Sequence, residues 1–179
     1  TEVIVHAWEQ WGEDCVTRFR GMFAFALWDR NRETLFLARD RLGVKPLHYA
    51  LLPGGFLVFG SELKALVAHP AFGREFDPFA IEEYFALGYV AEPRTIFAGT
   101  RKLPPGHRLT IRRGEPLRDP VEYWDVRFNP AASMGLDEAC RELDRRLEDS
   151  IRLRMISEVP LGAFLSGGVD SSAVVATMA

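Results

Sequence analysis

Residues 161–176 contain the pattern that most restricts how this chain can fold. A short apolar run, Leu161–Leu165, leads into the sequence SGGVDSS (166–172), and an apolar segment follows at once. Glycines tolerate positive φ and let backbone N–H groups approach an anion, and the start of the following helix adds unpaired donors and partial positive charge. The order strand, glycine loop, helix therefore predicts a phosphate-binding loop in an α/β domain.

The polar side chains of this loop suit a nucleotide. The hydroxyls of Ser166, Ser171 and Ser172 can donate to phosphate oxygens, and Asp170 can hold a bridging magnesium ion. The glycine and lysine spacing of P-loop kinases is absent, and so is the fingerprint of dinucleotide-binding domains. The alternative is an ordinary turn that caps a helix, which requires fewer of these residues.

Both ends of the chain fall inside expected elements. Residue 1 is a threonine, helical apolar spacing begins at once over 3–11, and the last residue is Ala179, soon after the loop. A phosphate loop of this kind needs further strands and helices around it. We therefore expect the sequence to be a fragment truncated at both ends.

Composition excludes several classes of function. A net charge of −3 with dispersed basic residues predicts no nucleic-acid partner. No apolar run reaches the length of about 18 residues that a membrane span needs. Cys15 and Cys140 lie far apart with no metal-ligand spacing, which favours free thiols in a reducing, cytoplasmic setting.

Before the loop, the pattern changes from strands to helix. Four apolar runs within 22–60 predict a four-strand meander, Ser61 is the expected N-cap of a helix over 62–68, and Asp77–Pro78 opens another helix. A Pro-Pro-Gly turn within 103–111 predicts an edge hairpin. A linker is expected near residues 125–136, followed by a long amphipathic helix from Leu136 to Met155.

Three features have plain structural readings. Arg39 and Asp40 are expected to form an ion pair that fixes a turn, in preference to a charged site. The four histidines have no acidic or cysteine companion at useful spacing and are expected to be structural or exposed. Cys15 is expected to be a buried structural thiol, since no nucleophile signature accompanies it.

Two parts of the chain resemble one family. The stretches 21–29, 38–47, 61–66 and 104–107 resemble the later half of a class II glutamine amidotransferase domain, and VPLGAFLSGGVDSS (159–172) resembles the pyrophosphatase loop of glutamine-hydrolysing asparagine synthetases. The resemblance implies an α+β chain with two domains. Residues 1–128 would be the C-terminal part of an N-terminal-nucleophile αββα sandwich, and 136–179 the first helix-strand-loop-helix of an α/β adenine-nucleotide (PP-loop) domain.

The resemblance also implies a reaction and its partners. Glutamine supplies ammonia, ATP and magnesium activate aspartate as its β-aspartyl adenylate, and ammonia displaces AMP to give asparagine. Partners would be glutamine, aspartate and ATP, with a homodimer allowed. Two alternatives stay open: a related amidotransferase with another carboxylate acceptor (β-lactam synthetase-like, or acting on a polysaccharide or peptide), and a non-catalytic interaction module.

Site residues carry over only where the motif matches. The nucleophilic cysteine of the family would lie upstream of Thr1, so no catalytic residue is assigned, and we expect the 179-residue chain alone to be inactive. Asp170 is the expected magnesium ligand, and Met22 matches a position that lines an ammonia tunnel, with core packing as the alternative. The expected ATP-binding residues are Phe164, Leu165, Ser166, Gly167, Gly168, Val169, Asp170 and Ser171.

Overall fold

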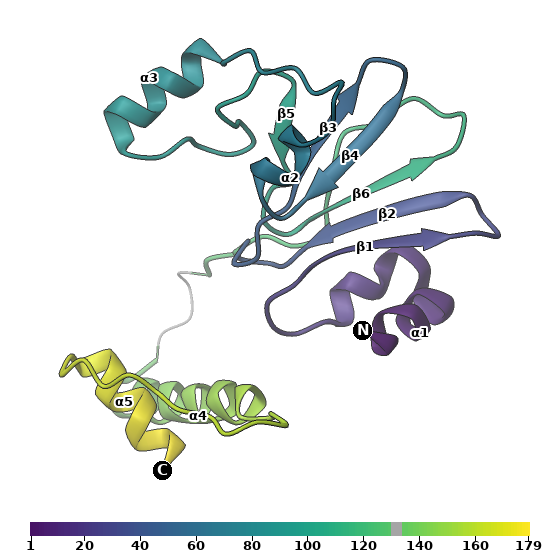
Figure 1. Cartoon of the computed structure of the whole chain (residues 1–179). Coiled ribbons are helices and arrows are strands. Elements are labelled where there is room, and N and C mark those ends of the chain that lie inside the picture. Colours follow the sequence, from purple (N-terminus) through teal and green to yellow (C-terminus); the bar gives the residue numbers. More distant parts are fainter. Residues whose placement is uncertain (130–133) are drawn as a thin grey trace. The chain divides into compact units, whose positions relative to one another are not determined.

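A computed structural model describes residues 1–129 and 134–179, which form two units, Thr1–Val126 and Arg127–Ala179 (Figure 1). Residues 130–133 of the expected linker lie outside the described residues. The first unit contains α1 (Glu2–Trp11), the 3-10 helix η1 (Gly12–Arg18), β1 (Ala24–Asp29), β2 (Thr34–Arg39), β3 (His48–Leu52), β4 (Phe56–Gly60), α2 (Leu63–Val67), α3 (Pro78–Leu87), β5 (Thr100–Lys102), β6 (His107–Arg112) and β7 (Val121–Glu122). The second unit contains α4 (Leu136–Arg154) and α5 (Val169–Met178).

The strands of the first unit form two antiparallel sheets instead of one meander. One sheet has the order β1-β2-β6-β7 and the other the order β4-β3-β5. The predicted hairpins β1–β2 and β3–β4 are present, but β2 pairs with β6, so the expected four-strand meander is wrong. The expected edge hairpin is also wrong, since β6 lies between β2 and β7. Local turn signals predict hairpins, whereas pairing between distant strands depends on the rest of the chain.

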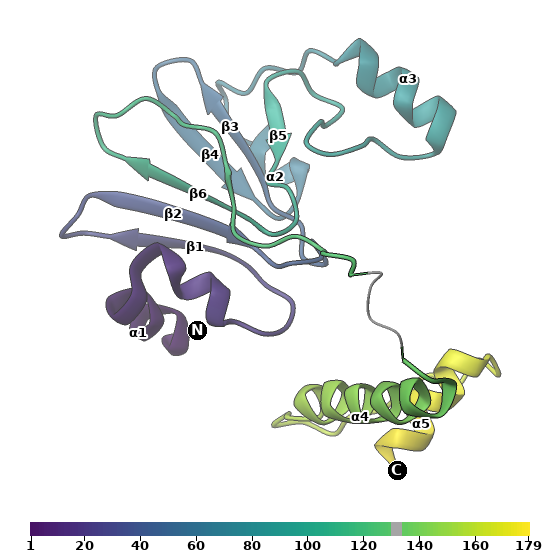
Figure 2. The ribbon, with the colours of Figure 1, turned by 180° about the vertical axis from the view of Figure 1, so that it is seen from behind.

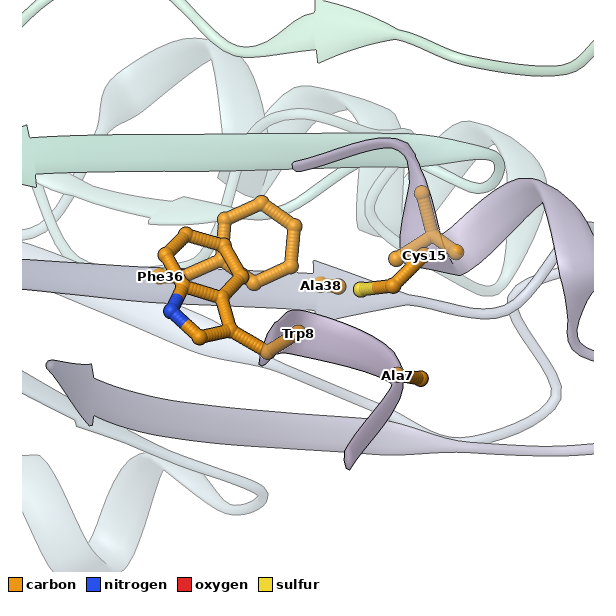
Figure 3. Close-up of a cluster of buried hydrophobic side chains, with 6 residues drawn as sticks. Ala7, Trp8, Cys15, Phe36 and Ala38 are labelled. Carbon is orange, nitrogen blue, oxygen red and sulfur yellow. The ribbon is translucent and has the colours of Figure 1, made fainter. Parts of the chain in front are cut away.

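Three clusters of buried side chains separate four layers. The first joins α1 and η1 to one face of the β1–β2 sheet, with Trp8 and Phe36 4.8 Å apart between ring centroids (Figure 3). The second fills the space between the two sheets through Leu37, Tyr49 and Leu109. The third packs α2 on the outer face of the second sheet, around Leu66. Figures 1 and 2 show the same order from opposite sides: helix, sheet, sheet, helix.

Helix starts agree with the sequence in one case and differ in another. The Asp77 carboxylate caps α3 by accepting the N–H groups of Phe79 and Ala80, as expected from Asp77–Pro78. Ser61 is not the N-cap of α2, because the helix begins at Leu63 after Glu62 and no side chain caps it. The backbone carbonyl of Ser61 instead accepts the Nδ1–H of His48 at 3.1 Å.

The second unit buries little. The amphipathic helix predicted from Leu136 is α4, and Ile151 is the one buried apolar residue of this unit among those described. The apolar run before the glycine loop forms no strand, because a strand needs a hydrogen-bonded neighbour and the described part of this unit contains none. No helix in 1–129 or 134–179 is long and apolar enough to cross a bilayer.

Candidate phosphate-binding loop

The predicted phosphate-binding residues lie together at the start of α5. Gly167 has φ +79°, which a side chain rarely allows, and Gly168 is the N-cap residue of the helix. The Ser172 N–H bonds to the Gly168 carbonyl at 3.0 Å, so the helix is closed from that residue onward. The N–H groups before Ser172 are the unpaired donors that a helix start presents to an anion.

Two hydroxyls donate to the Gly168 carbonyl, and a third bonds to one of them. Ser171 Oγ and Ser172 Oγ each donate to it, at 3.0 and 2.8 Å, and Ser166 Oγ lies 2.9 Å from Ser171 Oγ. Each hydroxyl can rotate its proton toward an incoming oxygen, so these bonds hold the loop in shape and can be exchanged for bonds to a phosphate. The loop therefore fits an anion with several oxygens.

Space and charge at the loop agree with that fit. A Cβ on Gly167 would meet no atom within 4 Å, and one on Gly168 would meet only the Oγ atoms of Ser166 and Ser171. Asp170 lies in the first turn of α5 and is exposed, so its carboxylate is free to reach a cation held by a phosphate. Phe164 is 99% exposed and Leu165 62% exposed, and both are available to a nucleotide base.

The other residues singled out in the sequence lie in the first unit. Met22 is half-exposed and belongs to none of the three buried clusters, so core packing does not account for it. Cys15 is fully buried in η1 and burial raises the pKa of its thiol, as expected for a structural cysteine. Both cysteines are free thiols. The described residues hold no group of three or more acidic, histidine or cysteine side chains that would suit a metal ion.

The sequence did not predict how Arg39 and Asp40 act. Both are buried, and instead of pairing with each other they hold separate parts of one junction. Asp40 accepts four backbone N–H groups, those of Phe23, Leu42, Val44 and Lys45. Arg39 donates to the carbonyls of Gly43, Lys45 and Leu103 and forms an ion pair with Glu92 at 2.7 Å. Glu92 is distant in sequence, so no local pattern indicated it.

Tyr123 closes this Arg39–Asp40 junction. Its hydroxyl donates to the Arg39 carbonyl at 2.6 Å, and burial together with the nearby Asp40 carboxylate raises the pKa of Tyr123 to about 12. The phenol thus stays protonated and remains a donor. The junction connects β1, β2, the loop before β3 and the chain before β6. It holds the point after Arg39 where the chain passes from the first sheet to the second.

Two family models match separate parts of the chain. A family model described as a glutamine amidotransferase domain matches residues 1–124, and one described as asparagine synthase matches residues 142–179. The chain is 41% identical to asparagine synthetase (glutamine-hydrolyzing) 3 of Bacillus subtilis, covering all of this chain and 29% of that protein. It is 38% identical to a putative asparagine synthetase (glutamine-hydrolyzing) 2 of Methanocaldococcus jannaschii, covering 99% of this chain and 35% of that protein.

A third relative carries a different name. The chain is 33% identical to the amidase chyE of Penicillium rubens, covering 99% of this chain and 26% of that protein. The chain thus spans about a third or less of the length of these three relatives.

Proposed function

Because the chain belongs to the family of glutamine amidotransferase domains, we propose that it forms part of a glutamine-hydrolysing asparagine synthetase. The single observation that carries the proposal is the Ser166–Ser172 loop at the start of α5, in a segment that matches the asparagine synthase family model. Relatives named asparagine synthetase align with the chain from end to end, which supports the same assignment.

The proposal includes two domains. Residues 1–128 would belong to an N-terminal-nucleophile αββα sandwich, and the helix-sheet-sheet-helix order of the three buried clusters supports this. Residues 136–179 would begin an adenine-nucleotide α/β domain of the PP-loop type, and the glycine loop ahead of α5 supports that. The free thiols of Cys15 and Cys140 are compatible with a cytoplasmic enzyme.

In the proposed reaction, glutamine provides ammonia and aspartate is amidated with ATP. ATP supplies a leaving group: pyrophosphate departs as the carboxylate becomes an acyl adenylate, and AMP departs when ammonia forms the amide. This chain's own contribution would be to bind and orient the phosphates. The backbone N–H groups at the start of α5 and the hydroxyls of Ser166 and Ser171 would donate to phosphate oxygens.

Asp170 would be the ligand of a magnesium ion that neutralises phosphate charge. Phe164 and Leu165 would contact the nucleotide. Gly167, Gly168 and Val169 would bind the phosphates through their backbone N–H groups. Met22 would line the path of ammonia, and its half-exposed side chain supports a role outside the core.

The test uses the longer protein of which we propose this chain to be a part. Asp170→Asn should lower ATP-dependent and glutamine-dependent formation of asparagine at least about tenfold, because a neutral amide binds magnesium more weakly than a carboxylate. Asp137→Asn is the matched control, since Asp137 is also an exposed first-turn aspartate, on α4, and should leave the rate unchanged. Unchanged asparagine formation in the Asp170→Asn protein would refute the role of the loop.

A second candidate is an amidotransferase of the same two domains with another acceptor. The similarity to the amidase chyE favours this second candidate. In addition, nothing among the described residues identifies which carboxylate is the acceptor. Supplying glutamine and ATP with aspartate or with other carboxylates, and identifying the amide by mass spectrometry, separates the two. If aspartate is the one carboxylate that is converted to an amide, the result supports the synthetase. If only another acid is converted, the result supports the second candidate.

A further inference from the structure

A cavity in the first unit has opposite charges on its walls that the proposed ligase chemistry does not use. Its volume is about 390 Å³, within the range of small-molecule pockets. Three segments meet there: the turn after β2 with Arg41, residues 104–107 that lead into β6, and residues 122–126 from the end of β7 onward. The Arg39–Asp40 junction fixes two of these segments, since the Gly106 N–H donates to the Asp40 carbonyl at 2.9 Å.

Arg41 brings to this cavity a cation that pairs with no described carboxylate. Its Cζ atom lies 5.8 Å from the centre of the Trp124 ring, and Nη2 donates to the Thr17 carbonyl at 3.2 Å. Nε is buried without an acceptor, and none of the acidic side chains described in the structure forms an ion pair with Arg41. Guanidinium groups bind carboxylates strongly through paired N–H donors, so Arg41, which forms no ion pair with a described carboxylate, is suited to the carboxylate of a ligand.

Two carboxylates line the same cavity. Glu122 and Asp125 are exposed, and neither forms an ion pair within residues 1–129 and 134–179. Asp125 Oδ1 accepts only the N–H of Val126, at 2.7 Å. A cation and two anions therefore line one cavity with no ion pair between them among the described residues, which suits a ligand that carries both charges.

The remaining walls narrow the ligand class further. His107 Nδ1 donates to the Pro105 carbonyl at 2.7 Å, which leaves Nε2 as the ring nitrogen that can bond to a ligand. Trp124 and the two prolines offer apolar surface. One cation against two carboxylates disfavours phosphate groups and acidic side chains, because either would add negative charge to an acidic lining.

We propose that this cavity binds a free α-amino acid with an uncharged side chain. Arg41 would receive the carboxylate, Glu122 and Asp125 the ammonium group, and Trp124 the aliphatic part. This assignment goes beyond the proposed ligase function and does not depend on it, since the cavity lies wholly in the first unit and its groups need neither ATP nor ammonia.

Trp124 provides a direct probe of binding in the 179-residue chain. The four tryptophans give four indole N–H signals in a nitrogen-15 NMR spectrum, and Trp124→Phe identifies the one from the cavity. Glutamine, asparagine or methionine, titrated to about 10 mM, should shift the Trp124 signal in a saturable way and leave the other three unchanged. Aspartate and glutamate should bind at least about tenfold more weakly.

Variants and partial ligands test the charge arrangement. Arg41→Gln and the double variant Glu122→Gln with Asp125→Asn should each weaken binding at least about tenfold. Arg32→Gln is the matched control, because the Arg32 guanidinium also lies over a tryptophan ring, that of Trp8 at 5.9 Å, outside the cavity, and should leave affinity unchanged. Propionate and butylamine, which carry one charge each, should bind much more weakly than the amino acids.

Three results would overturn the proposal. They are the absence of a saturable shift with any amino acid, equal affinity for propionate, and unchanged affinity in both charge variants. Should Arg41→Gln fail to fold, the double carboxylate variant still decides the point, because Glu122 and Asp125 are exposed and their replacement does not disturb buried structure.

Discussion

At the scale of single residues, the buried carboxylate of Asp40 does the work of several backbone hydrogen bonds. Only 1% of Asp40 is exposed, and its two oxygens accept four N–H groups, one from Phe23 just before β1 and three from the turn between β2 and β3. Buried N–H groups without an acceptor are costly, so this one side chain permits the sharp turn between β2 and β3. The sequence indicated a turn-fixing role and gave the wrong partner for it.

Replacement of Asp40 by asparagine tests this role. The amide keeps one oxygen and turns the other acceptor into a donor, which leaves buried N–H groups unpaired. We expect Asp40→Asn to lower the free energy of unfolding by about 2–4 kcal/mol. Urea denaturation measures the loss, and Asp119→Asn, at an exposed position of the same unit, should change stability by less than about 0.5 kcal/mol. Equal small losses in the two variants would contradict the account.

His48 makes stability depend on pH. Burial lowers its pKa, Lys102 and Arg39 lower it further, and the hydrogen bond to the Ser61 carbonyl opposes them. The unfolded histidine therefore binds a proton at a higher pH than the folded one. Stability from this group is complete above the unfolded pKa of about 6.5, and is lost as the pH falls from there toward the lower folded pKa.

The expected slope is up to about 1.4 kcal/mol per pH unit below pH 6.5. Urea denaturation between about pH 5 and pH 7.5 measures it. His48→Gln should remove most of the slope, whereas His6→Gln, at an exposed position of α1, should retain it. A slope that persists in the His48→Gln protein would assign the pH dependence to other groups.

At the scale of elements, local patterns predicted most of what the structure contains. The helix over 3–11, both hairpins, the cap at Asp77 and the long helix from Leu136 follow from apolar spacing and turn residues. The errors concern pairing. Arg39 and Glu92 lie far apart in sequence, and so do β2 and β6, so no window of neighbouring residues contained the information that separates the two sheets.

Gly106 is the clearest case of a residue required by the packing of elements. It has φ +64°, and a Cβ there would lie 2.2 Å from the Trp124 carbonyl oxygen, a contact with backbone that cannot rotate away. Gly114 also has a positive φ, of +81°, but a Cβ there would meet nothing within 4 Å. Substitution at Gly114 therefore measures the cost of the positive φ alone, and substitution at Gly106 adds the cost of the clash with the Trp124 backbone.

We expect Gly106→Ala to lower the free energy of unfolding by more than about 3 kcal/mol, because the backbone at Trp124 must move away from residue 106. Gly114→Ala carries only the strain of its φ, and should cost about 1 kcal/mol. Urea denaturation of both variants gives the comparison. Similar losses at the two positions would show that the contact with Trp124 is relieved without cost.

At the scale of the whole molecule, the two units differ in how much they bury. The first unit has three clusters of buried side chains, whereas Ile151 is the one buried apolar residue described in the second. Ion pairs on the surface of α4, such as Glu142 with Arg145 and Arg146, add little stability because they are exposed. Helices without packing open readily, so protection from hydrogen exchange should follow burial.

Helices α1 and α5 make a matched pair for this prediction, since each has ten residues. α1 buries Ala7 and Trp8 against the sheet, and α5 buries no residue. In the 179-residue chain, we expect amides of α5 to exchange at least about a hundredfold faster than those of α1, a ratio measured by mass spectrometry of peptides after exchange. If the two helices were equally protected, α5 would have to be covered by contacts that its exposed residues do not make in this structure, and the difference in burial would not govern the stability of the two units.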